Sequence, residues 1–129
     1  MPTQELEEFA KVLVQHVRDA AIQSSDRKAR ADSRSPVAKR WREAARGGVR
    51  ELMDTLIPDI VDDTIFYFLQ AIDQELLAIT FVASNGKRVD LPKDGLGELS
   101  GWYMGSPGWR AMFSQERFHD DVADLAGGV

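Results

Sequence analysis

The fold is decided by the stretch from Leu56 to Leu91, which reads L-I-P-D-I-V-D-D-T-I-F-Y-F-L-Q-A-I-D-Q-E-L-L-A-I-T-F-V-A-S-N-G-K-R-V-D-L. Its first half places apolar residues at the three- and four-residue spacing of a helix. Its second half holds two short apolar runs on either side of Asn85-Gly86, which is the strongest short-range signal for a β-hairpin. We therefore expect a helix over residues 59–73 that leads into a hairpin with strands at 77–83 and 88–91.

The predicted helix over residues 59–73 is apolar around more than half of its circumference, so it should be buried on two sides. Pro58 is expected to separate this helix from the one before it, because a residue that precedes proline is disfavoured in the α region. A two-residue turn at Asn85-Gly86 would pair Val82 with Val89. Since an isolated hairpin is marginally stable in water, these strands are expected to pack on helices.

Two further long helices are predicted before Pro58. The first covers residues 3–24, with Thr3 as its N-cap, and its apolar stripe consists of Leu6, Phe9, Ala10, Leu13, Val17, Ala20 and Ala21. The second begins at Pro36, with Ser35 as its N-cap, and Gly47-Gly48 predicts a kink or a close crossing within it. The polar segment at residues 25–35 lacks periodicity and is predicted to be either a mobile loop or a frayed helix.

The remainder of the chain predicts short helices. They are expected at residues 97–104 and 107–114, with a third within 115–125, and residues 126–129 should fray. The sequence thus predicts one mainly helical α+β domain over residues 1–129, with three longer helices, one β-hairpin and short C-terminal helices. A chain of 129 residues with 43% hydrophobic and 29% charged residues fits a single globular domain.

Composition also restricts the chemistry. The chain contains no cysteine, so it has no disulfide framework, thiolate metal site or cysteine nucleophile. No apolar run approaches the length of a membrane span, and the acidic N-terminus M-P-T-Q-E-L-E-E lacks the apolar core of a signal peptide. We therefore expect a cytoplasmic protein that does not associate with membranes.

The net charge of −5 conceals two blocks of opposite sign. Residues 27–50 hold nine Lys and Arg against two carboxylates, whereas residues 51–86 hold seven carboxylates and no Lys or Arg. Such blocks produce local fields of opposite sign. Either the two segments pack together and neutralise each other, or one of them forms a binding surface.

Two groups of residues have the composition of metal sites. Asp59 and Asp63 lie four residues apart on one helix face and offer oxygen ligands, but carboxylates at a helix start also favour the helix dipole. His119-Asp120-Asp121 resembles a ligand pair, although His16 is the only other histidine. No nucleophile elbow or phosphate-binding glycine loop is present. We therefore predict no metal, no cofactor and no catalytic residue.

Two aromatic segments need an interpretation. Arg40, Trp41, Arg42 and Arg46 combine cations with an aromatic ring, as nucleic-acid-binding surfaces do, but a pI near 5.0 argues against nucleic acid. The run from Gly101 to Phe113 is rich in glycine and large rings. It is either a satellite core that covers the hairpin, an interface, or the lining of a small-molecule pocket.

The segments E-L-S-G-W-Y-M-G-S-P-G-W-R and I-P-D-I-V-D-D-T-I-F-Y-F-L-Q-A-I-D carry a resemblance. Between Ile57 and Asp121 the chain resembles small bacterial proteins, some of which are similar to immunity proteins that neutralise secreted antibacterial toxins. The resemblance implies a cytoplasmic, non-enzymatic inhibitor of one cognate protein. It implies no particular binding residues.

Charge and composition are compatible with this function, because an acidic surface free of Lys and Arg suits a basic partner such as a toxin domain. The predicted partner-binding residues are Asp59, Asp62, Asp63, Asp73, Glu75, Trp102, Tyr103, Trp109 and Arg110. One alternative is a small-molecule-binding protein or small enzyme with a pocket between the hairpin and the aromatic C-terminal segment. Another is a homodimer formed through the free edge of the hairpin.

Overall fold

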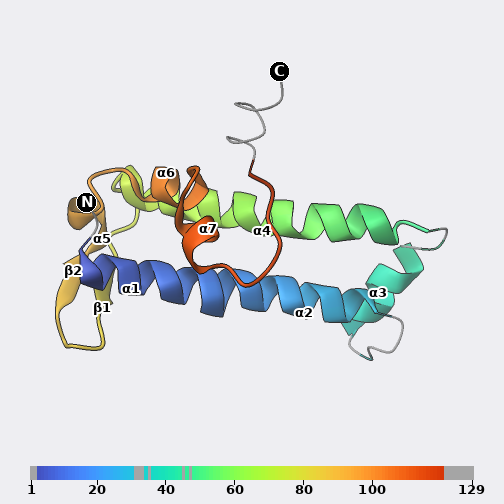
Figure 1. The fold of residues 1–129 in the computed structure, drawn as a ribbon. Helices are drawn as coiled ribbons and strands as arrows, with labels where there is room; N and C mark the ends of the chain where they lie inside the picture. Colours follow the sequence, from blue (N-terminus) through green and yellow to red (C-terminus); the bar gives the residue numbers. More distant parts are fainter. Residues whose placement is uncertain (1–2, 31–33, 35, 45, 47, 121–129) are drawn as a thin grey trace, which may run out of the picture.

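The protein has a mainly helical α+β fold, which confirms the predicted class. A computed structural model describes residues 3–30, 34, 36–44, 46 and 48–120. A continuous helical rod of α1 (Gln4–Val12), η1 (Leu13–Arg18) and α2 (Asp19–Ala29) lies beside α4 (Arg50–Asp73), which runs in the opposite direction (Figure 1). At one end of this pair lies α3 (Pro36–Ala44), and at the other lies the hairpin of β1 (Thr80–Val82) and β2 (Arg88–Asp90).

The first helix is longer than predicted. Thr3 caps it as expected, with Oγ1 accepting a hydrogen bond from the Leu6 amide at 3.2 Å. The helix then continues to Ala29, so residues 25–29 are helical; of the two predicted alternatives, the loop is wrong there. The reason lies in tertiary contact, because Arg117 forms two hydrogen bonds of 2.9 and 3.0 Å with the carboxylate of Asp26 in this last part of the helix. Residues 31–33 and 35 of the predicted loop, including the predicted N-cap Ser35, lie outside the described residues.

The buried stripe of the first helix changes phase at η1, which is a π-helix. A π turn contains more residues than an α turn, so positions after it rotate relative to a regular helix. The predicted inward residues Val17 and Ala20 are exposed, Val17 by 49%, while Arg18, Asp19 and Ile22 are buried. The prediction for the second half of this stripe is therefore wrong by about one residue.

Pro58 does not end a helix but lies buried inside α4. The break before α4 falls instead near Gly48, whose φ of +95° belongs to the left-handed region that glycine favours. Proline has no amide hydrogen, so the carbonyl of Asp54, four residues earlier, loses its usual helical donor. Arg117 Nε donates a hydrogen bond of 2.9 Å to this carbonyl. A distant side chain thus compensates for the proline that the sequence rule treated as a stop.

The hairpin forms around the predicted turn, but its strands are shorter than the predicted ranges 77–83 and 88–91 and its register is different. Thr80 pairs with Asp90, Phe81 with Val89 and Val82 with Arg88. The loop contains three residues, Ser84 to Gly86, because the Ala83 amide bonds to the Lys87 carbonyl at 2.8 Å. Gly86 has a φ of +85°, as expected when a turn is closed by one left-handed residue.

Three short helices follow the hairpin: α5 (Leu91–Asp94), α6 (Leu99–Met104) and α7 (Trp109–Phe113). Both predicted helices of the aromatic segment are therefore present. Residues 115–120 are not helical, which contradicts the start of the third predicted helix. The rest of that prediction, and the predicted fraying at residues 126–129, lie outside the described residues.

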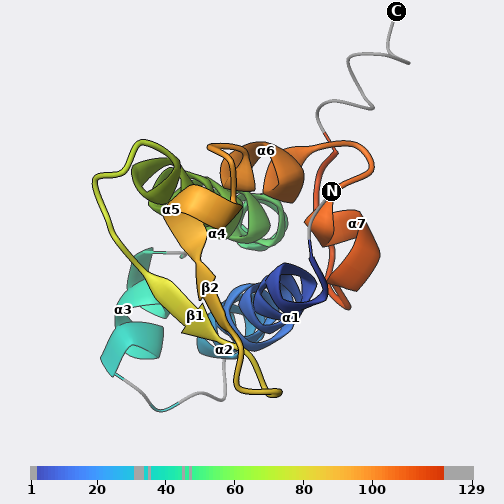
Figure 2. The same ribbon diagram turned by 90° about the vertical axis from the view of Figure 1, so that its left-hand side faces the viewer.

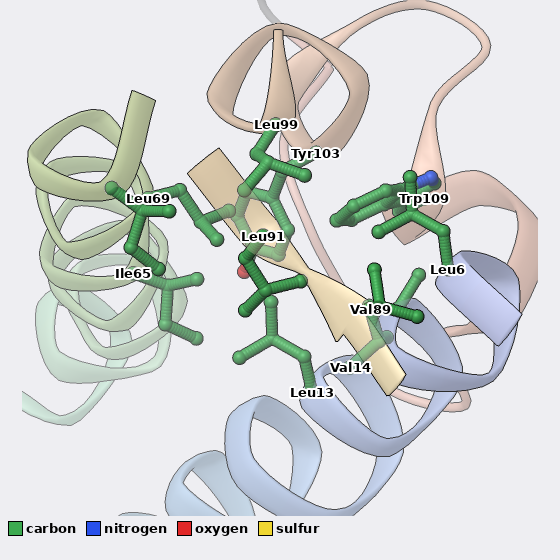
Figure 3. Packing of buried hydrophobic residues seen from close by; sticks show 12 residues of the cluster. Leu6, Leu13, Val14, Ile65, Leu69, Val89, Leu91, Leu99, Tyr103 and Trp109 are labelled. Carbon is green, nitrogen blue, oxygen red and sulfur yellow. The ribbon is translucent and has the colours of Figure 1, made fainter. Parts of the chain in front are cut away.

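The core lies where the helical pair meets the hairpin and the short helices (Figure 3). It joins residues from every layer, namely Leu6, Ala10, Leu13, Val14, Ile65, Leu69, Ile72, Val89, Leu91, Leu99, Tyr103 and Trp109. Viewed along the helices, the hairpin and α7 lie on opposite sides of the pair formed by α1 and α4 (Figure 2). None of the helices in the described ranges combines the length and apolar character that a membrane span requires.

Candidate partner-binding surface

Asp62 lies at the centre of a buried polar network on the inner face of α4. Its carboxylate accepts hydrogen bonds from Arg18 Nε at 2.6 Å, Tyr103 Oη at 2.6 Å and Arg110 Nη1 at 2.8 Å. The side chains of Arg18, Asp62 and Arg110 are all at least 96% buried. Two guanidinium groups therefore share this one carboxylate, which joins α4 to η1, α6 and α7.

The segment at residues 114–120 closes over this network. The Arg117 carbonyl accepts a bond of 2.7 Å from Arg18 Nη2, and the His119 carbonyl accepts one of 3.2 Å from Arg110 Nη1. The carboxylate of Asp19, which is also buried, accepts a hydrogen bond of 2.8 Å from the Gln115 amide. The Phe118 ring covers the guanidinium of Arg110 at 4.9 Å. The segment is thus held by polar contacts without forming a helix of its own.

The surroundings of the network set its charge states. Burial alone would lower the pKa of Arg18, but the hydrogen bonds and charge of Asp62 raise it above its ordinary value. Burial, reinforced by the charge and hydrogen bond of Asp62, raises the pKa of Tyr103 far above its ordinary value. The tyrosine therefore stays protonated and donates to the carboxylate. Arg110 Nε is buried without a hydrogen-bond partner among the described residues, which costs about 1–3 kcal/mol.

The other two aspartates of this turn, Asp59 and Asp63, face solvent. They line a polar cleft of about 350 Å³ between α4 and the segment that follows α6; its lining residues are Asp59, Ile60, Asp62, Asp63, Met104, Arg110 and His119. His119 Nδ1 lies 2.8 Å from Asp59 Oδ1. The two residue groups with the composition of metal sites thus meet at this cleft, although the described residues contain no set of three side chains arranged to hold a metal ion.

On the other flank of α4 lies an apolar groove. It has a volume of about 300 Å³ and separates α3 from the first half of α4; its lining residues are Trp41, Ala44, Val49, Met53, Leu56, Ile57 and Ile60. Ile60 lines both the groove and the cleft. Along this outer face α4 exposes large apolar side chains, with Leu52 at 55%, Leu56 at 41%, Ile60 at 61% and Tyr67 at 61%. We call these four residues, together with Asp59 and Asp63, the outer ridge.

The structure keeps some of the predicted binding residues at the surface and buries others. Asp59, Asp63 and Glu75 are exposed and Trp102 is half-buried. The side chains predicted wrongly as surface contacts are those of Asp62, Tyr103, Trp109 and Arg110, all of them buried. They are buried because Asp62 faces the core side of α4, where the two arginines and Tyr103 converge.

Asp73 has a local structural role. Its carboxylate accepts hydrogen bonds of 2.9 Å from the amides of both Leu99 and Ser100, and so satisfies the first turn of α6. Glu75 follows the end of α4 in a left-handed conformation, with a φ of 62°. It lies several turns of helix away from Asp63, so the predicted acidic residues do not form one continuous patch.

The aromatic segment belongs to the core, which was one of its three predicted interpretations. Phe9 packs edge-on against both Phe81 of the hairpin, at 5.5 Å between centroids, and Trp109, at 6.2 Å. Trp102 lies 6.1 Å from Trp109. These rings fill the space between the hairpin and the short helices, where the alternative function placed a ligand pocket.

The prediction missed the apolar members of the outer ridge. Ile60 and Tyr67 lie in the helix over residues 59–73, which the sequence predicts to be buried on two sides, but both are exposed. Helical phase separates them from the core, because the apolar residues of the outer ridge lie opposite Ile65 and Leu69 on a 3.6-residue period. We found no known protein family, curated protein or solved structure that matches this chain.

Proposed function

We propose that this protein is a non-enzymatic binding module that uses the outer ridge to hold another protein. The observation that carries the proposal is the exposure of four large apolar side chains beside Asp59 and Asp63 on one face of α4. Exposed apolar residues grouped beside charges are typical of protein interfaces. Residues 51–86 contain no Lys or Arg, so the partner surface that fits best is basic with apolar anchors.

The buried network supports this role by fixing α4. Asp62 ties the helix to Arg18 and Arg110 at the level of Asp59 and Asp63, so the outer ridge projects from a rigid support. A rigid surface loses little conformational freedom on binding. If the resemblance to immunity proteins holds, the partner is a basic toxin domain, and occupation of that domain by the ridge inhibits it.

The test is affinity capture from native lysate, read by mass spectrometry at low and high salt. Wild type is compared with Asp59→Lys/Asp63→Lys and with a control of equal net charge, Glu7→Lys/Glu98→Lys, at exposed positions elsewhere. A partner captured by wild type and by the control is then purified and titrated. We expect the ridge variant to bind it at least about tenfold more weakly.

Two results would contradict the proposal. One is a partner whose affinity is the same for the ridge variant and wild type. The other is the loss of binding by both variants in parallel with a loss of thermal stability. A further assay addresses the inhibitor function, because addition of the protein should reduce the activity of a captured toxin in proportion to the fraction bound.

A further inference from the structure

The groove between α3 and α4 extends toward α3 from the outer ridge, with which it shares Leu56 and Ile60. All of its lining residues are apolar, and Leu52 beside it is 55% exposed. Apolar surface of this kind on a small protein is typical of an interface. The charges on its two sides indicate which partner would cover it.

The two sides of the groove have opposite charge. On the α3 side, the exposed cations are Lys39, Arg40 and Arg46, together with Arg50 at the start of α4; the one exposed carboxylate on α3 is Glu43, so this side is net positive. On the α4 side, the exposed charges within the outer ridge are Asp59 and Asp63. None of the ion pairs found among the described residues joins one of those four cations to a carboxylate. The blocks of opposite charge therefore do not neutralise each other within one chain through these residues.

We propose that a second copy of this chain covers the groove in a two-fold symmetric homodimer. A two-fold axis along α4, in the plane of the contact, places the cationic side of each copy opposite the acidic side of the other. At the centre of the interface, the groove and Leu52 of one copy contact the groove and Leu52 of the other. A two-fold interface requires this, because the same surface patch is used by both copies. The surface is therefore self-complementary, because its cationic side pairs with its acidic side and its apolar centre pairs with the apolar centre of the other copy.

This interface differs from the hairpin-edge dimer. Each strand has only three residues, so an added strand would gain few backbone hydrogen bonds. The amide of Ser84 beside β1 is already occupied by Glu8, at 2.9 Å. The groove offers apolar burial as well as charge pairing, and the hairpin lies at the opposite end of the helical pair from α3 (Figure 1).

The experiment measures the mass of the full chain by sedimentation velocity over a wide range of concentrations. We expect a reversible dimer in the wild type. Leu52→Lys should raise the dimer dissociation constant at least about tenfold, because an ammonium group would be buried in an apolar contact. Met112→Lys is the control, since Met112 is 57% exposed on α7, and it should dimerise like wild type.

Charge pairing is tested by complementation. The variant Arg40→Glu/Arg46→Glu makes both sides of the groove acidic, and Asp59→Lys/Asp63→Lys makes both sides basic. Each variant should be monomeric alone, while an equimolar mixture should form a heterodimer, because each altered side then faces its complement. A monomeric wild type at every concentration, a dimer insensitive to Leu52→Lys, or a mixture that stays monomeric would overturn the proposal.

The homodimer does not depend on the proposed binding function, although both use residues of the outer ridge. The variant Arg40→Glu/Arg46→Glu separates them, because it leaves every residue of the outer ridge in place. If capture of a basic partner survives in this variant while the dimer is lost, both inferences stand. A dimer without any captured partner would leave the homodimer intact and contradict the binding module alone.

Discussion

The two faces of α4 carry the same kinds of residue in different surroundings. On the inner face, Asp62 accepts bonds from two arginines and a tyrosine, and Leu69 is fully buried. On the outer face, Asp63 and Ile60 are exposed. One turn of helix thus contains an aspartate that holds the fold together and a neighbour that is available to a partner. Residue type alone does not distinguish the buried aspartate from the exposed one. The difference depends on the side chains that surround each residue.

The largest contrast is expected between two neighbouring aspartates. Asp62→Ala removes the carboxylate that two buried guanidinium groups share, and breaking such a pair costs about 3–5 kcal/mol. Asp63→Ala should change the free energy of unfolding by no more than about 0.5 kcal/mol. Chemical denaturation of both variants beside wild type measures the difference. Similar values for the two would mean that the buried network does not stabilise the fold.

The apolar residues provide the next contrast. Leu69→Ala leaves a cavity in the core and should lower the free energy of unfolding by about 2–5 kcal/mol. Leu52→Ala alters a side chain that is 55% exposed, and its effect should stay within about 0.5 kcal/mol. The comparison uses the same substitution at two depths on one helix. A large loss of stability for Leu52→Ala, measured in dilute protein, would show that this side chain is packed within the monomer.

The smallest effect is expected in the pH dependence. The pKa of Tyr103 is raised by burial and by Asp62, whereas tyrosine in the unfolded chain ionises near about pH 10. Above that pH the unfolded state loses this proton and the folded state keeps it. The contribution of Tyr103 to the free energy of unfolding is therefore fully present below about pH 10. It falls as the pH rises further, by up to about 1.4 kcal/mol per pH unit.

The measurement is the free energy of unfolding from about pH 9 to about pH 11. Tyr103→Phe should flatten this dependence, although its stability at neutral pH is lower because Asp62 loses a donor. Tyr67→Phe is the matched control, since Tyr67 is 61% exposed on the outer face, and it should follow wild type. Identical slopes for both variants would show that Tyr103 ionises as readily in the folded as in the unfolded protein.

The fold class and the helix-to-hairpin unit could be predicted because both depend on local patterns, namely apolar spacing and the Asn85-Gly86 turn. The errors share a different origin. The helix continues past Pro58 because Arg117, 63 residues from Asp54 in sequence, binds the carbonyl that proline leaves without a donor. No local rule contains such a contact.

The candidate site was predictable to a similar extent. The absence of Lys and Arg from residues 51–86 pointed to an acidic surface, and Asp59 and Asp63 are indeed exposed. Helical phase would have excluded Asp62, which precedes Ile65 by three residues and Leu69 by seven and so shares their face. The pairing of Asp59 with His119 could not be foreseen, because residues 114–120 are placed by side-chain contacts and have no periodicity of their own.

The π turn at Leu13–Arg18 makes the charged interior depend on the length of the chain as well as on its composition. A π turn and an α turn differ by about one inserted residue. A regular helix of the same length would turn Arg18 and Asp19 toward solvent and bring Val17 and Ala20 inward, because the phase after Leu13 would move by about one residue. Loss of the one extra residue, by contrast, would let a regular helix keep Arg18 in its present phase. The extra residue thus brings Arg18 to Asp62, at a place where the regular phase of this sequence offers an aliphatic side chain.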